Sequence, residues 1–266
     1  MSRIERAKAA QETIEIFKRG YYFVDGSKVD CQSKYSTRFL PEEQLDTLAP
    51  PLGSYAPRYE VVNESVVDTV VRYGSESCGV LNFASAKNPG GGFLNGSLAQ
   101  EEALAVSSDL YISQLEAIQL YEINRRGRSL LYTHNMIYSQ GITFIRDGKM
   151  GLLSSSVAAN ILTAPAVNAG AYYQNEKGSK GTVLTVMEKR MRYILNVFAA
   201  MGDRTVILGA YGCGVFRNDT ADVADIFYRL LKDEEMERFF ERIVFAVYDP
   251  RGQQYGVFEE RFGGRQ

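Results

Sequence analysis

The chain carries, at residues 90–102, the sequence GGGFLNGSLAQEE. Three consecutive glycines lead toward two adjacent carboxylates, and a helix is predicted to begin between them, at about Ser97. A glycine run lets the backbone approach a ligand closely and lets successive N–H groups converge on an anion. The N-terminus of a helix adds unpaired donors and a favourable dipole. The stretch therefore predicts a binding loop for a phosphate-bearing ligand, with carboxylates directly behind it.

An apolar run at residues 78–83 precedes the glycines and fits a buried strand. From residue 59 onward, strands and helices alternate in the same way, which predicts an α/β fold with three layers and a mixed, largely parallel central sheet. In such sheets, ligands sit beyond the carboxyl ends of the strands. The expected strands are 59–62, 78–83, 137–138, 142–145, 160–163, 204–208 and 242–247, and the expected helices are 65–73, 97 to past 111, 182–200 and 219–231.

The N-terminal part of the chain has a different texture. Residues 2–19 predict an amphipathic helix that ends at Gly20. Residues 30–58 contain four prolines and are expected to be irregular. Because no low-complexity linker follows, we expect residues 1–58 to form a helical extension packed on a catalytic domain of residues 59–266.

A second glycine-rich loop has the sequence GAYGCGVFRN at residues 209–218, again between an expected strand and an expected helix. Two such loops at one sheet edge suit a diphosphate with a nucleoside at either end. The simpler reading is that the glycines only make tight turns. Neither loop matches a P-loop, and the glycine order of the second loop differs from the dinucleotide fingerprint, which disfavours a Rossmann dehydrogenase.

Composition excludes several classes of protein. The 266 residues carry a net charge of −2, so no broad basic field attracts nucleic acid, and no direct DNA binding is expected. Three separated cysteines and one histidine indicate neither disulfides nor a zinc site, and we expect no metal and no cofactor. There is no apolar run long enough to span a bilayer and no signal-like N-terminus, so no membrane partner and a cytoplasmic location are expected.

The paired glutamates Glu101 and Glu102 are candidates for acid/base chemistry. Neighbours on a helix diverge by about 100°, so one carboxylate can enter a cleft while the other reaches its rim. Burial would raise a carboxyl pKa toward that of a general acid. The alternative is that both are solvated glutamates of a first helical turn, favoured there by the helix dipole.

Three glycines, a spacer of seven residues and Gln-Glu-Glu resemble the signature of the microbial, or bacterial-type, poly(ADP-ribose) glycohydrolases. The segments LNFASAKNP at residues 81–89 and GAYGCGVFRN at 209–218 also resemble that family. The likeness runs from about residue 59 to 250, and an N-terminal extension is typical of the microbial branch. The resemblance implies a macrodomain fold, poly(ADP-ribose) or ADP-ribosylated proteins as partners, hydrolysis of ribose–ribose bonds, and ADP-ribose as product.

The resemblance also implies site residues. It gives Glu102 the role of catalytic acid and base, and gives Glu101 the role of holding the distal ribose. Eukaryotic members of the family have an asparagine shortly before the glycines, where this chain has Ser85. We expect the side-chain amide of Asn88 to contact the ribose in place of that asparagine. It places the glycines of the first loop at the diphosphate and distal ribose, and the second loop around the diphosphate. The implied substrate-binding residues are Asn88, Gly90, Gly91, Gly92, Gln100, Gly212, Cys213, Gly214, Val215 and Phe216.

Other functions remain open on these residues. The runner-up is a reader that binds ADP-ribose without turnover, and the glutamate pair argues against it. A hydrolase of another ADP-ribosyl bond, on a protein side chain or a nucleobase, has the same motif. His134 and the basic residues Arg125, Arg126 and Arg128 are interpreted as structural and as solvated surface, respectively, and the sequence does not identify the residue that stacks adenine.

Overall fold

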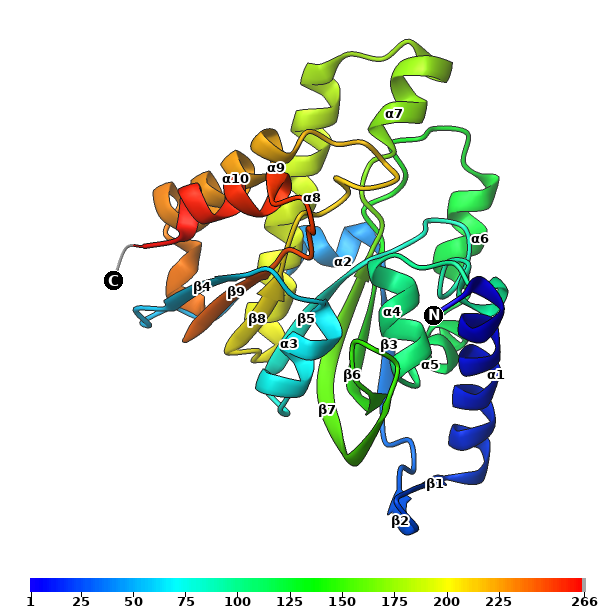
Figure 1. Cartoon of the computed structure of the whole chain (residues 1–266). Coiled ribbons are helices and arrows are strands. Elements are labelled where there is room, and N and C mark those ends of the chain that lie inside the picture. Colours follow the sequence, from blue (N-terminus) through cyan, green and yellow to red (C-terminus); the bar gives the residue numbers. More distant parts are fainter. Residues whose placement is uncertain (265–266) are drawn as a thin grey trace.

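The computed structural model describes residues 1–264. A seven-stranded sheet runs through the middle of the molecule in the order β3-β6-β7-β5-β8-β9-β4 (Figure 1). The strands from β7 to β4 pair in parallel, and β3, β6 and β7 pair antiparallel, which confirms the mixed, largely parallel sheet. The strands are β3 (Ser36–Leu40), β4 (Arg58–Val62), β5 (Cys78–Phe83), β6 (Met136–Arg146), β7 (Leu152–Ala164), β8 (Thr205–Leu208) and β9 (Arg242–Ala246).

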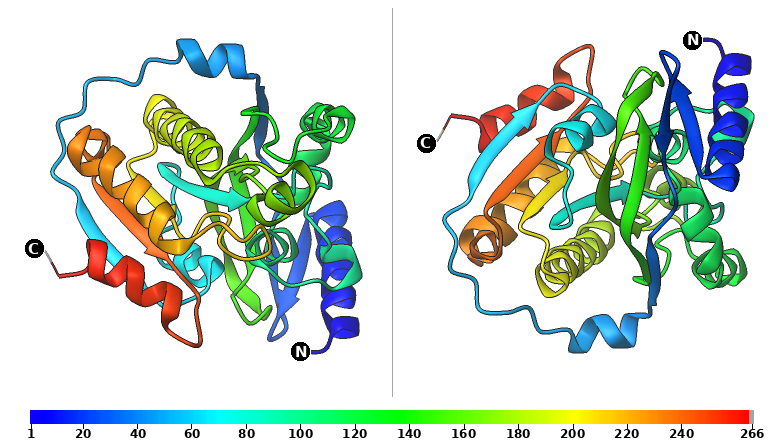
Figure 2. Two further views of the ribbon diagram at one scale, coloured as in Figure 1. Left: turned by 90° about the horizontal axis from the view of Figure 1, so that it is seen from above. Right: turned by 90° about the horizontal axis from the view of Figure 1, so that it is seen from below.

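Helices cover both faces of the sheet, which makes the three layers expected from the sequence. Because successive side chains of a strand point to opposite faces, Leu81 packs with one helical layer and its neighbour Val80 packs with the other. The C-terminal helices gather near one edge of the sheet and α1 lies near the other (Figure 2). One layer is α8 (Lys180–Met201), α9 (Thr220–Tyr228) and α10 (Gln253–Phe262), and the other is α3 (Val66–Tyr73), α4 (Gln100–Ser107) and α5 (Leu110–Glu116).

The antiparallel ribbon of β6 and β7 is longer than predicted. The two short strands expected at 137–138 and 142–145 form one strand, and the strand expected at 160–163 is only the end of β7. The pairing register shifts between Ser139 and Ile142, and Gly141 adopts a φ of 75° at this point. A glycine at positive φ accommodates the bulge that keeps the strand continuous.

The helix expected from Ser97 to beyond Tyr111 is two helices, α4 and α5. Ser108 between them is extended, with φ −148° and ψ 179°, and bridges to Phe144 of β6. Its hydroxyl donates to the Leu104 carbonyl and accepts from the Leu110 N–H. A serine that satisfies local backbone groups in this way competes with helix continuation, and the interruption turns α5 toward β6.

The N-terminal extension is joined to the sheet. Helix α1 (Arg3–Arg19) is capped by Ser2 and ends at Gly20 in the left-handed conformation, as predicted. The hairpin of β1 (Tyr21–Val24) and β2 (Ser27–Asp30) follows. The stretch 30–58, expected to be irregular, instead contains the edge strand β3 and helix α2 (Glu42–Thr47). The division of the chain after residue 58 stays a prediction, but β3 pairs with β6 inside the central sheet.

Helix α1 packs directly under the glycine loop. Arg3 donates from Nε to the Asn95 carbonyl at 2.8 Å, and Arg6 donates from Nε to the Gly96 carbonyl at 2.8 Å. Phe93 is buried in a small cluster with alanines of α1. The extension therefore fixes the base of the loop. Within residues 1–264, none of the helices combines the length and apolar character needed to cross a membrane.

Candidate active site

The first glycine loop connects β5 to α4 and lies over the two glutamates. Gly90 and Gly91 have φ values of 63° and 58°, which favour glycine. A Cβ atom on Gly91 would lie 2.5 Å from Oε1 of Glu102 and 3.1 Å from Oε2 of Glu101. The backbone therefore passes so close to both carboxylates that no side chain fits at residue 91.

Glu102 faces the loop and is half-buried. The Gly92 N–H donates to Oε1 of Glu102 at 2.9 Å. Within residues 1–264, its second oxygen, Oε2, has no hydrogen-bond donor. One oxygen of this carboxylate is thus held by the loop while the other is free to meet a ligand, which is the arrangement required of a group that exchanges a proton with substrate.

Glu101 lies deeper than Glu102 and is buried, with 3% of its surface exposed. Oε2 accepts from the Ser85 N–H at 2.7 Å, and Oε1 accepts from the side-chain amide of Asn82 at 3.2 Å. Burial raises the pKa of Glu101 to about 8, although these hydrogen bonds act in the opposite direction. The two adjacent glutamates therefore occupy different environments: Glu102 is half-buried at the loop and Glu101 is buried among hydrogen-bond donors.

Gln114 of α5 links the loop to the buried glutamate. Its Oε1 accepts from the Gly90 N–H at 2.7 Å, and its Nε2 donates to Oε1 of Glu101 at 3.2 Å. The amides of Gln114 and Asn82 both approach the Thr163 hydroxyl. Neither amide was predicted from the sequence. Asn82 carried a signal, because it is the one polar side chain late in an apolar strand, whereas nothing local marks Gln114.

Gln100 and Asn88, which the resemblance assigns to substrate binding, both make hydrogen bonds that shape the loop. Gln100 accepts from the Phe83 N–H at 2.9 Å and donates to the Leu81 carbonyl at 2.7 Å, so its amide ties the start of α4 to the end of β5. Asn88 is exposed, and its carbonyl accepts from the Gly91 N–H at 3.1 Å. Asn88 therefore closes the turn through its backbone and presents its side chain to solvent.

The second glycine loop follows β8, and Ala166 and Asn218 pack against it at Gly212. Gly212 has a φ of 75°, and a Cβ there would lie 2.6 Å from both Cβ of Ala166 and the amide nitrogen of Asn218. That amide donates to the carbonyls of Gly212 and Val167. Cys213 is buried, and burial raises the pKa of its thiol to about 12. The thiol is therefore uncharged, and the loop offers its backbone rather than a reactive sulfur.

The tip of the second loop is open. A Cβ on Gly214 would meet nothing within 4 Å, and Val215 is 82% exposed. Phe216 lies against Tyr132, with ring centroids 6.0 Å apart. The Gly214 and Phe216 carbonyls accept from the N–H groups of Arg217 and Gly170, respectively, so the tip offers a ligand its own N–H groups and two apolar side chains.

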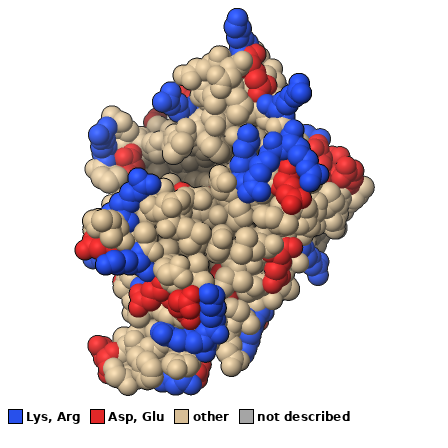
Figure 3. Space-filling model, turned by 90° about the vertical axis from the view of Figure 1, so that its right-hand side faces the viewer, with Lys and Arg blue, Asp and Glu red and all other residues tan. Residues whose placement is uncertain are grey.

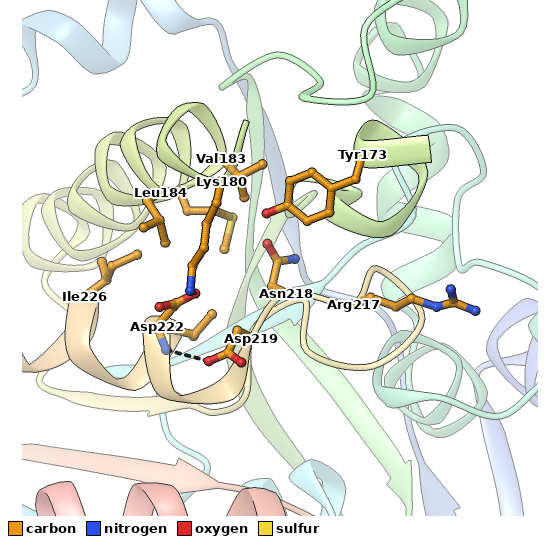
Figure 4. A pocket seen from close by; sticks show the side chains of 11 residues that line it. Tyr173, Lys180, Val183, Leu184, Arg217, Asn218, Asp219, Asp222 and Ile226 are labelled. Carbon is orange, nitrogen blue, oxygen red and sulfur yellow. Dashed lines mark hydrogen bonds and ion pairs between the residues drawn. The ribbon is translucent and has the colours of Figure 1, made fainter. Parts of the chain in front are cut away.

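A small pocket of about 120 Å³ lies beside this loop, between α8 and α9 (Figure 4). Tyr173 points into it, and Lys180 pairs with Asp222 across it at 2.6 Å. Arg217 and Asn218 of the loop also line it, but neither Glu101 nor Glu102 does. This pocket is therefore separate from the carboxylates.

His134 has a structural contact. The fully buried Arg190 donates from Nε to its Nδ1 at 3.3 Å, and also donates to the carbonyls of Leu131 and Pro165. Burial and the charge of Arg190 lower the pKa of His134 to about 4, so the imidazole is neutral. The pair fixes the loop that carries Tyr132 against Phe216.

An exposed aromatic lies farther along the same sheet edge. Tyr248 follows β9 and is 69% exposed. The next residue, Asp249, exchanges two hydrogen bonds with the side chain of Asn63 after β4, at 2.9 Å each. Because β5, β8 and β9 are neighbours, the glutamates, the second loop and Tyr248 follow one another along the carboxyl ends of the strands.

The fold and the glycine loops define a class of protein, namely macrodomain-like α/β domains that bind ligands beyond the carboxyl ends of parallel strands. The family model for the microbial-type poly(ADP-ribose) glycohydrolase (PARG) catalytic domain matches residues 10–147. The chain belongs to this family of glycosidases. A search of curated proteins by sequence gives no match.

Solved structures agree with this assignment. The poly(ADP-ribose) glycohydrolase of Thermomonospora curvata is 36% identical, with a TM-score of 0.89 over 97% of this chain and 99% of that one. The same enzyme bound to the inhibitor ADP-HPD is 35% identical, with a TM-score of 0.86 over 97% and 99% of the two chains. The enzyme of Deinococcus radiodurans in complex with ADP-ribose is 40% identical, with a TM-score of 0.78 over 85% of this chain and 93% of that one.

Proposed function

We propose that the chain hydrolyses the ribose–ribose O-glycosidic bonds of poly(ADP-ribose) and releases ADP-ribose, with Glu102 as the general acid and base. The observation that carries this proposal is the placement of Glu102, which has one oxygen held by Gly92 and the other free at the loop. Family membership supports the reaction, and this geometry supports Glu102 as the residue that exchanges the proton.

The reaction needs two proton transfers. Protonated Glu102 gives its proton to the ribose oxygen that leaves, the bond from that oxygen to C1″ breaks, and positive charge develops on the sugar. The Glu102 carboxylate then takes a proton from a water molecule as the water oxygen attacks C1″. Both products are neutral at the cleaved bond, and Glu102 returns to its starting form. The substrate's own diphosphate supplies negative charge near the cation.

Glu101 cannot act as the opposing carboxylate of a two-carboxylate glycosidase. Adjacent helical residues diverge by about 100°, so they do not flank one bond from opposite faces. We assign Glu101 to positioning and to contact with the distal ribose.

The substrate is proposed to follow the strand order. The distal ribose lies at Gly90, Gly91 and Gly92 after β5, with Phe216 packed against it, and the diphosphate lies at the second loop after β8. The adenosine then reaches β9, where the exposed ring of Tyr248 offers a stacking surface. Asn88, with its exposed amide, is a candidate for a ribose contact. Gln100 and Gln114 act on the substrate indirectly, through the groups they position.

The proposal includes ADP-ribosylated proteins as substrates and neither DNA nor membranes as partners. The three cysteines are free thiols, which supports a reducing, cytoplasmic setting. Within residues 1–264, no three or more His, Cys, Asp or Glu side chains are grouped so that they could hold a metal ion.

The test is incubation of the purified chain with poly(ADP-ribose), followed by chromatography of the products. Release of free ADP-ribose is expected. Parallel incubations with mono-ADP-ribosylated protein and nucleic acid separate the proposed activity from hydrolysis of another ADP-ribosyl bond. Tight binding of ADP-ribose without any release would instead identify a reader and overturn the proposal.

A further inference from the structure

We propose that four basic residues beside the glycine loop, Lys87, Arg125, Arg126 and Arg128, form a second anion subsite that holds the diphosphate of the ADP-ribose unit on the leaving side of the cleaved bond. They are called the basic patch below. The inference rests on the proposed function, because it specifies which part of the polymer lies where. It predicts selectivity for polymer over substrates with an uncharged leaving group.

The basic patch is connected to the catalytic loop through a short series of hydrogen bonds. Arg125, at the end of α6 (Gln119–Arg126), donates from Nε to the Lys87 carbonyl at 2.7 Å. The Lys87 N–H donates to the Ser85 hydroxyl at 3.3 Å, and the Ser85 N–H donates to Glu101 at 2.7 Å. The cations are thus anchored to the segment that enters the glycine run, and not placed on a remote surface.

Most of this charge is not neutralised by the protein. Within residues 1–264, no carboxylate lies within 4.0 Å of the cationic groups of Lys87, Arg125 or Arg128. Arg126 approaches Glu122 at 3.5 Å, but its side chain is 81% exposed, so this pair contributes little. The other nearby acid is Glu176, which accepts from the Leu130 N–H and the Ser129 hydroxyl. On a chain with a net charge of −2, such a cluster is a local feature that can attract an anion.

The strand order places the basic patch on the leaving side. Relative to β5, the second loop follows β8 on one side, while α6 packs on β6 and β3 on the other through Leu120 and Tyr121. Neighbouring strands are about 4.8 Å apart, so β6 lies roughly 10 Å from β5. A substrate whose adenosine and diphosphate lie toward β9 and β8 continues, beyond the cleaved bond, toward α6. The next diphosphate of the polymer reaches the surface where these cations stand.

The shape of this side agrees with the assignment. Figure 3 shows the side of the molecule that carries α1 and α6, and basic side chains gather around a hollow in its upper part. A polymer bound in this hollow would place the diphosphate of its next unit against the basic patch, on the solvent side. The sequence analysis treated Arg125, Arg126 and Arg128 as solvated surface, because the anchoring of Arg125 to Lys87 is not visible in the sequence.

The test compares two substrates and two charge-reversal variants, one with three substitutions in the patch and a control with two outside it. One substrate is purified poly(ADP-ribose), and the other is ADP-ribose that bears a neutral fluorogenic group on C1″, so that its leaving group has no phosphate. The first variant combines Lys87→Glu, Arg126→Glu and Arg128→Glu. It keeps the Arg125 bond, since that bond uses the backbone carbonyl of residue 87. The control variant combines Arg58→Glu and Lys149→Glu, two exposed cations at the opposite end of the sheet.

We expect the patch variant to lose about tenfold in kcat/KM for polymer at low salt, through KM, and to hydrolyse the fluorogenic substrate at the original rate. The dependence of polymer kcat/KM on salt becomes flatter by roughly 0.7 for each phosphate contact that is lost. Equal polymer kinetics in the patch and control variants overturns the inference. Absence of hydrolysis by the unmodified chain is a failure of the proposed function instead, and polymer affinity of the two variants then decides on the patch.

Discussion

The Gly92 N–H donates to Oε1 of Glu102 at 2.9 Å, while Oε2 of the same carboxylate has no donor within the described residues. The loop thus orients the catalytic group through the backbone and leaves one oxygen for substrate. A side chain that contacts substrate through a single free oxygen can be changed to an amide without altering its shape. This relationship makes the role of Glu102 directly testable.

Glu102→Gln is expected to keep ADP-ribose affinity and to lower kcat by about 10² to 10⁴-fold, the usual contribution of a general acid or base. The amide keeps the size of the side chain and can still accept from Gly92, but it cannot exchange the proton. Product release by chromatography gives kcat, and calorimetric titration with ADP-ribose gives affinity. Glu43→Gln, on the exposed surface of α2, is the matched control. Wild-type-like turnover in Glu102→Gln would remove Glu102 from the mechanism.

Gly91→Ala is expected to abolish activity for a steric reason. Its Cβ would lie 2.5 Å from Oε1 of Glu102, and an L-residue at this φ of 58° also costs about 1–2 kcal/mol. Gly26→Ala separates the two effects, because Gly26 has a φ of 79° with nothing within 4 Å of the new Cβ. Both variants should lose similar backbone stability in denaturant unfolding, and only Gly91→Ala should lose turnover. Full activity in Gly91→Ala would show that the loop moves away from the carboxylates.

Much of the fold was predictable because its signals are local. Residues 78–83 are apolar apart from Asn82, as expected of a strand buried on both faces, and Ser65 and Gly20 mark helix ends by their own chemistry. The length of β7 was not predictable, because Ser154, Ser155 and Ser156 are exposed there and interrupt the apolar pattern. Backbone pairing with β6 gives β7 its length, and the pattern of apolar side chains does not reveal that pairing.

The site was predictable in part for the same reason. The glycines and glutamates are adjacent in sequence, so their proximity follows from one loop and one helix start. Gln114 contacts Gly90 across 24 residues, and Arg125 contacts Lys87 across 38. Those contacts depend on the break at Ser108 and on how α5 and α6 pack, which no local pattern specifies. The place of Tyr248 at the same sheet edge could be predicted only from the order of the strands, which the sequence does not specify.

Gln114 is expected to act as a positioning residue. Gln114→Leu leaves the Gly90 N–H without its acceptor and Glu101 without one donor, which costs about 1–3 kcal/mol of unfolding free energy. Because the loop then holds Glu102 less well, kcat should fall more than the affinity for ADP-ribose. Gln114→Asn, which keeps the amide on a shorter side chain, is expected to recover part of kcat. Gln11→Leu on the exposed face of α1 serves as control, and equal kcat in Gln114→Leu and that control would contradict the role.

Stability should fall as pH rises from 6.5 to 8 because of Glu101. Burial raises the pKa of Glu101 to about 8 in the folded chain, against about 4.3 when unfolded. Between these values the folded chain holds one proton more than the unfolded chain, so the unfolding free energy decreases by up to about 1.4 kcal/mol per pH unit. Other buried groups act at lower pH, since burial raises the pKa of Asp109 and of Asp203 to about 6 and lowers that of His134 to about 4.

Glu101→Gln isolates that contribution. The glutamine should be less stable overall, because its NH₂ group meets the donors of Ser85, Asn82 or Gln114. It cannot ionise, however, so the decrease between pH 6.5 and 8 should disappear. Urea unfolding of both proteins at half-unit pH steps, with unchanged m-values as a check on two-state behaviour, gives the difference curve. A difference curve that is flat over this range would mean that Glu101 is already ionised in the folded chain at pH 6.5, and that its three donors outweigh burial.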